Sequence, residues 1–77
     1  MTNSPPARSF VVCIRNRGYP AALEVRKLYR RLADPKASRM GLMRVVDESG
    51  GDYLYPAGFF LPVRLSAAVL RAIGRRR

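Results

Sequence analysis

The residue types that most often carry catalysis or bind metals are scarce in this chain. Its 77 residues include no His and a single Cys. The usual pairs of nucleophile and general base therefore cannot be assembled, and zinc sites built from nitrogen and sulfur ligands are excluded. The one thiol, Cys13, lies in an apolar run, where a small buried residue is more typical than a reactive one. We expect no enzymatic activity, no cofactor and no bound metal.

The one group of acidic residues lies in a turn that contains two glycines. Asp47, Glu48 and Asp52 could weakly coordinate a hard cation, but their spacing matches no calcium-binding loop. Solvated carboxylates are common in such turns. Gly50 and Gly51 lack the following Lys and the strand-to-helix context of a phosphate-binding loop. The turn is therefore interpreted as structural.

The charge of the chain is strongly unbalanced, with 15 basic and 5 acidic residues and a net charge of +10. A surface of this kind attracts polyanions such as nucleic acids. Two interpretations stay open: the charge is functional, or an Arg-rich composition merely keeps a small domain soluble. In the first case, the residues expected to contact phosphates are Arg15, Arg17, Arg26, Lys27, Arg30, Arg31, Arg39 and Arg44.

The elements around the acidic turn form the clearest pattern in the sequence. Runs of β-forming residues at 42–46 and 53–55 flank the turn at 47–52. A Pro- and Gly-containing corner at 56–58 follows, and then a short apolar strand at 59–63. Strand, turn, strand, tight corner and short strand together predict a compact antiparallel meander.

Three further elements are predicted outside the meander: a short apolar strand at 9–15, one helical turn within 34–41 and a helix at 67–73. Asp34 and Ser66 are residue types that cap helix N-termini. Two helical turns are unstable alone, so the apolar side of the last helix must pack on the sheet or on a partner. We expect a core made of Val12, Ile14, Val25, Leu28 or Tyr29, Met43, Val45, Leu54 and Phe60.

Residues 21–32 are ambiguous between two kinds of structure. Apolar residues at positions 21, 25, 28, 29 and 32 follow a helical period, and Asp34-Pro35 is typical of a helix stop. The competing interpretation is a strand with Leu23, Val25 and Tyr29 on one face, which Lys27 interrupts. The local pattern taken alone favours the helix.

Residues 22–63 resemble a Src-homology-3-like small β-barrel. Gly41-Leu42 is similar to the strand start that follows that family's variable loop, and residues 54–60, LYPAGFF, resemble its Leu-Phe-Pro-x-x-Tyr-Val run, which carries a one-turn 3₁₀ helix. The chain is also similar to small, uncharacterised bacterial proteins with a DESGxDYLYP-type core. The resemblance implies a mainly β fold, an antiparallel barrel of about five strands with a short C-terminal helix. It also implies that residues 22–32 form a strand.

The sequence departs from the members of that family that bind polyproline peptides. It has no Trp, and Arg15 and Arg17 stand where those members carry an acidic loop. A polyproline-binding role is therefore disfavoured. If the corresponding surface binds another protein, its expected residues are Tyr53, Tyr55, Pro56 and Phe59, although packing in the core and rim is the commoner use of such aromatics.

These observations predict one small domain with short tails. We expect a disordered tail at 1–7, a barrel domain at 8–65, a C-terminal helix at 66–74 and a basic tail at 75–77. The expected role is interaction with an unknown protein partner, through the apolar rim and the C-terminal helix, as a monomer or homodimer. The alternative is weak, sequence-nonspecific binding of nucleic acid, RNA in particular. No apolar run reaches the roughly 18 residues of a membrane span, so we expect a cytoplasmic protein without membrane contact.

Overall fold

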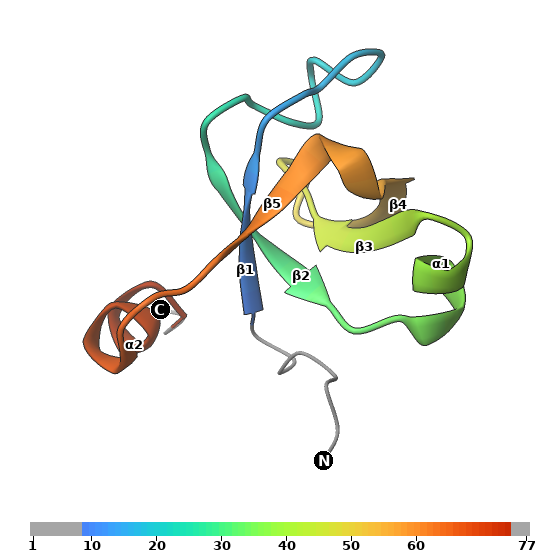
Figure 1. Cartoon of the computed structure of the whole chain (residues 1–77). Coiled ribbons are helices and arrows are strands. Elements are labelled where there is room, and N and C mark those ends of the chain that lie inside the picture. The colour runs from blue at the N-terminus through green and yellow to red at the C-terminus, as the bar shows by residue number, and fades with distance from the viewer. Residues whose placement is uncertain (1–8, 75–77) are drawn as a thin grey trace.

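The computed structural model describes residues 9–74 and contains five antiparallel strands in one sheet (Figure 1). The sheet has the order β4-β3-β2-β1-β5. In chain order the elements are β1 (Ser9–Cys13), β2 (Leu28–Leu32), α1 (Pro35–Arg39), β3 (Leu42–Val46), β4 (Asp52–Pro56), the 3₁₀ helix η1 (Ala57–Phe59), β5 (Phe60–Val63) and α2 (Ala67–Gly74).

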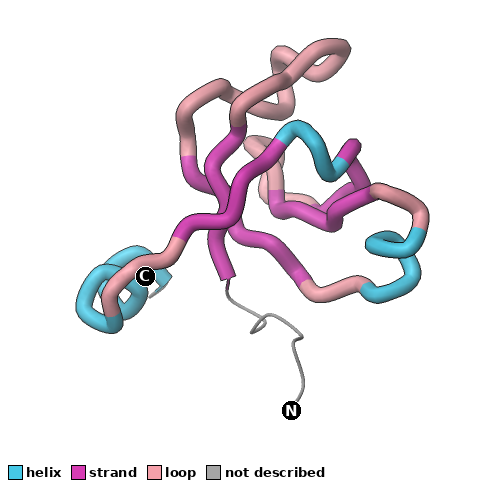
Figure 2. Tube along the Cα trace, viewed as in Figure 1, coloured by secondary structure: helices cyan, strands magenta, loops and turns pink. Residues whose placement is uncertain are grey.

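The mainly β fold expected from the sequence is confirmed. The strand order is compatible with a small Src-homology-3-like fold, although the sheet is not closed, because no ladder joins β4 to β5 within residues 9–74. The predicted tails at 1–7 and 75–77 lie outside the described residues. Figure 2 shows the strands crossing at the centre, with α2 joined to β5 by a short loop and standing to one side of the sheet.

The core receives alternate residues from the strands of the sheet. Val45 of β3 and Phe60 of β5 are buried there, as predicted, and Met43 packs against them at partial exposure. Leu23 reaches this core from the loop before β2 and is fully buried. The buried cluster consists of Val11, Cys13, Leu23, Tyr29, Val45, Tyr55 and Phe60.

The prediction was wrong about which side of two strands, β1 and β4, faces this core. Side chains alternate along a strand, so an error of one residue exchanges the two faces. In β1 the buried residues are Val11 and Cys13, while Val12 is half-buried and Ile14, just past the strand, is exposed. In β4 Tyr55 is buried and the predicted Leu54 is exposed. In β2 the open choice between Leu28 and Tyr29 is decided for Tyr29, which is buried while Leu28 is exposed.

Residues 21–27 form neither the predicted strand nor the alternative helix. Only Leu28–Leu32 of the predicted strand at 22–32 is extended, and the preceding residues are a loop of turns. The Leu23 N–H donates to the Tyr19 carbonyl at 3.0 Å, which directs Leu23 into the core in place of Val25, which is exposed. Arg26 has a positive φ of 73°, a left-handed conformation that interrupts both strand and helix.

The predicted caps are found at both helices. The Ala37 N–H donates to Asp34 Oδ1 at 3.0 Å, with Pro at the start of α1, and the glycine that follows α1 has the positive φ typical of that position. At α2 the Val69 N–H donates to Ser66 Oγ at 3.2 Å. Sequence propensity therefore placed these short helices, although it did not place the loop before β2.

Candidate interaction surface

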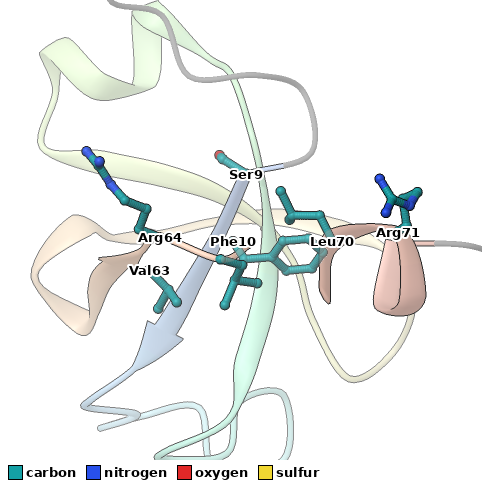
Figure 3. A pocket seen from close by; sticks show the side chains of 7 residues that line it. Ser9, Phe10, Val63, Arg64, Leu70 and Arg71 are labelled. Atoms are coloured by element: carbon teal, nitrogen blue, oxygen red, sulfur yellow. The ribbon is translucent and has the colours of Figure 1, made fainter. Parts of the chain in front are cut away.

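An apolar groove lies between α2 and the ends of β1 and β5 (Figure 3). Its volume is about 360 Å³. Figure 3 shows the Phe10 ring pointing towards α2 and Leu70 lying over it, with Arg64 and Arg71 on opposite sides of the view. The residues that line this hollow, called the α2 groove from here on, are Ser9, Phe10, Val63, Arg64, Leu65, Leu70 and Arg71.

The strand register explains why apolar side chains reach this groove. Because Val11 and Phe60 point into the core, alternation places Phe10 and Val63 on the opposite face, and these two are direct cross-strand partners. One step along, Val12 pairs with Leu61 of β5 and with Leu28 of β2. The outer face of these three strands thus carries six neighbouring residues: Phe10, Val12, Leu28, Arg30, Leu61 and Val63.

Several apolar residues at this end of the molecule are exposed to solvent. Leu61 is 52% exposed on β5, and Val69 and Ile73 on α2 are 42% and 45% exposed. Val69 and Ile73 are four residues apart and so lie on one side of the helix. Other exposed apolar side chains, such as Met40 and Tyr53, lie elsewhere on the surface, but those of β5 and α2 adjoin an apolar groove, and contiguous apolar surface of this kind is characteristic of interaction sites.

The charges around the groove are all positive. Arg64 and Arg71 line it, and Arg30 is the cross-strand partner of Phe10 on the adjoining face. All five acidic residues lie between positions 24 and 52, in the loop before β2, at the start of α1, and around the β3–β4 turn. No ion pair within residues 9–74 involves Arg30, Arg64 or Arg71. The groove is therefore a cationic apolar surface.

The opposite end of the sheet is built differently, around the buried carboxylate of Asp47. Its oxygens accept hydrogen bonds from the Tyr55 hydroxyl, from Ser49 Oγ at 2.6 Å and from the Ser49 N–H at 2.9 Å. Burial pushes the pKa of Asp47 up, but the hydrogen bonds from Ser49 and Tyr55 outweigh it, and the pKa lies below its usual value. Burial and the bond to Asp47 raise the pKa of Tyr55.

A second polar network ties the loop before β2 to the β3–β4 turn. The Tyr29 hydroxyl donates to Glu48 Oε2 and accepts from the Glu24 N–H at 2.7 Å, while Lys27 Nζ lies 2.7 Å from the same Glu48 oxygen. Hydrogen bonds from Lys27 and Tyr29 lower the pKa of Glu48. Burial and the bond to Glu48 raise the pKa of Tyr29. The Glu48 N–H also donates to the carbonyl of Ala22, so this network holds the loop that delivers Leu23 to the core.

The four aromatic and Pro residues predicted as an interaction surface do not form one accessible patch. Tyr55 is buried in the core, and Pro56 and Phe59 are half-buried. Tyr53 is exposed and lines an open hollow with Tyr19, whose ring packs edge-on against Tyr55 at 4.9 Å between centroids. Most of this aromatic surface is thus used in packing.

The predicted phosphate-contacting residues are distributed over several parts of the surface. Arg15 and Arg17 lie together in an open hollow of about 590 Å³ that Phe59 also lines. Two others are in ion pairs: Lys27 with Glu48 and Glu24, and Arg44 with Asp34 at 2.9 Å. The remaining four lie in a turn, on β2 and at the end of α1: Arg26, Arg30, Arg31 and Arg39.

Phe10 and Val63 were not predicted as surface residues, although the C-terminal helix was expected to take part in the contact. The available signal was the run Phe10–Ile14, in which apolar residues follow one another without alternation. An unbroken run of this kind indicates a strand that is apolar on both faces. In β1 one face fills the core and the other faces the α2 groove and the surface beside it.

Comparison with known proteins found no match among protein-family models, curated proteins or solved structures. The resemblance to Src-homology-3-like proteins therefore stays a prediction. In residues 9–74 no helix is long and apolar enough to cross a membrane, and no three His, Cys, Asp or Glu side chains gather as metal ligands.

Proposed function

We propose that this protein is a small, non-enzymatic module that binds another protein through the α2 groove and the outer face beside it. The observation that carries this proposal is the gathering of exposed apolar residues around Phe10, Val63 and Leu70. A domain of this size has little apolar surface to spare, because a single core is already marginal near 77 residues. Leaving Leu61, Val69 and Ile73 exposed therefore favours a partner that covers them.

The composition of the surface supports the same conclusion. Protein interfaces combine an apolar centre with aromatic residues and Arg, and are poor in Lys, Asp and Glu. The α2 groove combines Phe10 and aliphatic side chains with Arg64 and Arg71, and contains no acidic residue. The hollow itself is small, so a stable complex of about 1,000 Å² or more of buried surface would extend onto the outer face and the exposed side of α2.

Site-specific crosslinking in cells tests this proposal. A photo-reactive phenylalanine analogue replaces Leu70, and a matched protein carries it at Tyr53, at the other end of the sheet. Irradiation should give a protease-sensitive adduct of defined mass from position 70 and none from position 53. The adduct should disappear when Val63→Asp is added. Equal labelling at both positions, or an adduct that survives Val63→Asp, would contradict the proposal.

Nucleic-acid binding is a second candidate function, favoured by the hollow that Arg15 and Arg17 share with Phe59. Two guanidinium groups beside an aromatic ring could contact a phosphate and stack on a base. The other predicted contacts are dispersed, and two of them are neutralised by Glu48 and Asp34. Binding of this kind would be weak, indifferent to sequence and reduced by salt. Fluorescence anisotropy with labelled RNA and DNA at about 50 and 200 mM salt measures it, with Arg15→Glu as the variant and Arg39→Glu as the control.

A further inference from the structure

We propose that the partner segment bound by the α2 groove is an amphipathic helix with large apolar residues on one side and acidic residues along its flanks. This inference rests on the proposed function and names the chemistry of the partner. It follows from three properties of the surface: which groups are exposed, which backbone edges are open, and which charges surround the groove.

Side chains rather than backbone groups are what this end of the sheet offers to a partner. β5 is an edge strand, the position at which other proteins add an extended peptide to a sheet. Pro62 lies within it and has no N–H to donate, and the Phe60 N–H is already bonded to the Ala57 carbonyl. The other edge strand, β4, ends in Pro56. A partner strand would find few backbone groups to pair with, whereas a helix binds through its side chains and needs none.

The shape of the surface suits a helix. α2 forms one wall, the outer face of β1 and β5 forms the floor, and the hollow of about 360 Å³ lies between them. Apolar residues spaced three and four apart on a bound helix would enter this hollow and continue along the row formed by Val12 and Leu61. Helices that dock in grooves of other proteins bind by this arrangement of anchors.

The charges select an acidic partner. Arg30, Arg64 and Arg71 surround the apolar floor, and no carboxylate of residues 9–74 is paired with them. A second copy of this chain would bring the same three arginines against them, and like charges placed opposite one another oppose association. Nucleic acid would satisfy the arginines but would leave the aliphatic floor without a matching surface. An amphipathic helix flanked by Glu and Asp would pair its carboxylates with the arginines and cover the floor with its apolar side.

Selection from a peptide library tests the inference without knowledge of the natural partner. A displayed library of 20-residue helix-forming peptides, with all surface positions varied, is selected on the wild-type protein and depleted on Leu70→Gln. Leu70 lies on α2 outside the buried core, so this variant should keep the fold of the sheet. We expect enriched peptides with Leu, Phe or Ile at positions i, i+3 or i+4, and i+7, flanked by Asp and Glu.

One synthetic peptide of the enriched type then provides quantitative tests. Its addition should shift the NMR signals of Phe10, Val63 and Leu70 and leave those of Tyr53 unchanged. Its affinity should fall about tenfold or more with Leu70→Gln, but not with the control Leu54→Gln. Arg71→Glu should weaken it several-fold, Arg71→Lys should restore most of the affinity, and higher salt should reduce the difference between them.

The other occupants are separate outcomes of the same experiments. Enriched peptides that are basic, proline-rich or extended, and that still depend on Leu70, would overturn the acidic-helix inference while leaving the proposed function in place. Sedimentation that shows a dimer lost in Leu70→Gln would make a second copy the occupant, and displacement of the peptide by micromolar dodecanoate would make it a small amphiphile. No enriched peptide would also overturn the inference, and if position 70 gives no crosslink either, the proposed function fails with it.

Discussion

The β3–β4 turn and the α2 groove lie at two ends of the same sheet and differ in how their side chains are satisfied. At the turn, the carboxylate of Asp47 and the tyrosines bonded to it and to Glu48 find their partners within the chain. At the groove, Leu61, Val69 and Ile73 are exposed and Arg64 and Arg71 have no acidic partner within residues 9–74. The polar groups described at the first end are satisfied within the fold, while the second end has charged and apolar groups that a binding partner would satisfy.

This difference explains where the stability of the domain should reside. Core packing and buried hydrogen bonds join β2, β3, β4 and the loop before β2 into one unit. α2 faces the sheet across the α2 groove, where Leu70 lies over the Phe10 ring. The fold can therefore persist without a fully docked α2, which leaves the groove free to change on binding.

Hydrogen exchange should show the largest contrast between the two ends. Amides of β3 should exchange only through global unfolding, because β3 pairs with strands on both sides and contributes the fully buried Val45. Amides of α2, a two-turn helix, should exchange through local opening. We expect β3 to exchange about 1,000-fold more slowly, the factor that corresponds to roughly 4 kcal/mol. Protection in α2 equal to that in β3 would contradict the expected difference in local stability between the two ends of the sheet.

Truncation of one leucine at each end gives the next largest effect. Leu23→Ala should lower the free energy of unfolding by about 2–5 kcal/mol, since Leu23 is fully buried and its removal leaves a cavity. Leu61→Ala should change it by about 0.5 kcal/mol or less, since Leu61 is 52% exposed. Urea denaturation of both variants measures the difference. Similar losses for the two would show that the outer face contributes to folding, not only to binding.

The role of the Asp47 network can be measured through its dependence on pH. Asp47→Asn should cost about 1–3 kcal/mol at pH 7, because a charged acceptor of several hydrogen bonds is lost. The folded-state pKa of Asp47 is below its usual value, so the stability that it contributes is present above about pH 4 and is lost as the pH falls through the folded pKa. The cost of the substitution should therefore shrink towards pH 2.

The matched control for this measurement is Asp52→Asn, in the same hairpin. Asp52 is exposed, and its side chain makes no hydrogen bond or ion pair within residues 9–74. Its substitution should leave both stability and the acid transition nearly unchanged. An equal effect of the two substitutions would show that net charge, rather than the buried network, controls unfolding in acid.

The two ends of the sheet also differ in how well the sequence predicted them. The bounds of β3, Leu42–Val46, and the Asp34 cap follow from local propensities that the tertiary structure reinforces. The register of β1 could not be read, because Phe10 and Val12 on the outer face are as apolar as Val11 and Cys13 in the core. Surplus apolar residues on the outer face thus both misled the assignment of the core and mark the candidate site.

The local sequence pattern could not predict the loop at 21–27 or decide which tyrosines are buried, for a different reason. Leu23 is buried because hydrogen bonds of this loop with Tyr19, Tyr29 and Glu48 fold it over the core. Tyr19 is near in sequence, but Glu48 is remote, and the place of the Tyr29 hydroxyl depends on the strand register. Tyr55 can lie in the core because Asp47 accepts a hydrogen bond from its hydroxyl. Burial of a tyrosine hydroxyl requires a hydrogen-bond partner, which here only the tertiary structure supplies.

The smallest expected effect is at Ser9, where the groove meets the core. Ser9 Oγ is buried and has no hydrogen-bond partner among residues 9–74, and the Nε of its cross-strand partner Arg31 is in the same condition. A buried hydroxyl without a partner contributes no hydrogen bond to stability, so Ser9→Ala should change the free energy of unfolding by no more than about 0.5 kcal/mol and can raise it. The comparison residue is Ser49, whose hydroxyl donates to Asp47 at 2.6 Å, and Ser49→Ala should cost about 1 kcal/mol. Thermal denaturation of the two serine variants at pH 7 measures both. A larger loss at Ser9 than at Ser49 would mean that the groove end, not the turn, holds the more important polar contacts, which would reverse the contrast between the two ends of the sheet.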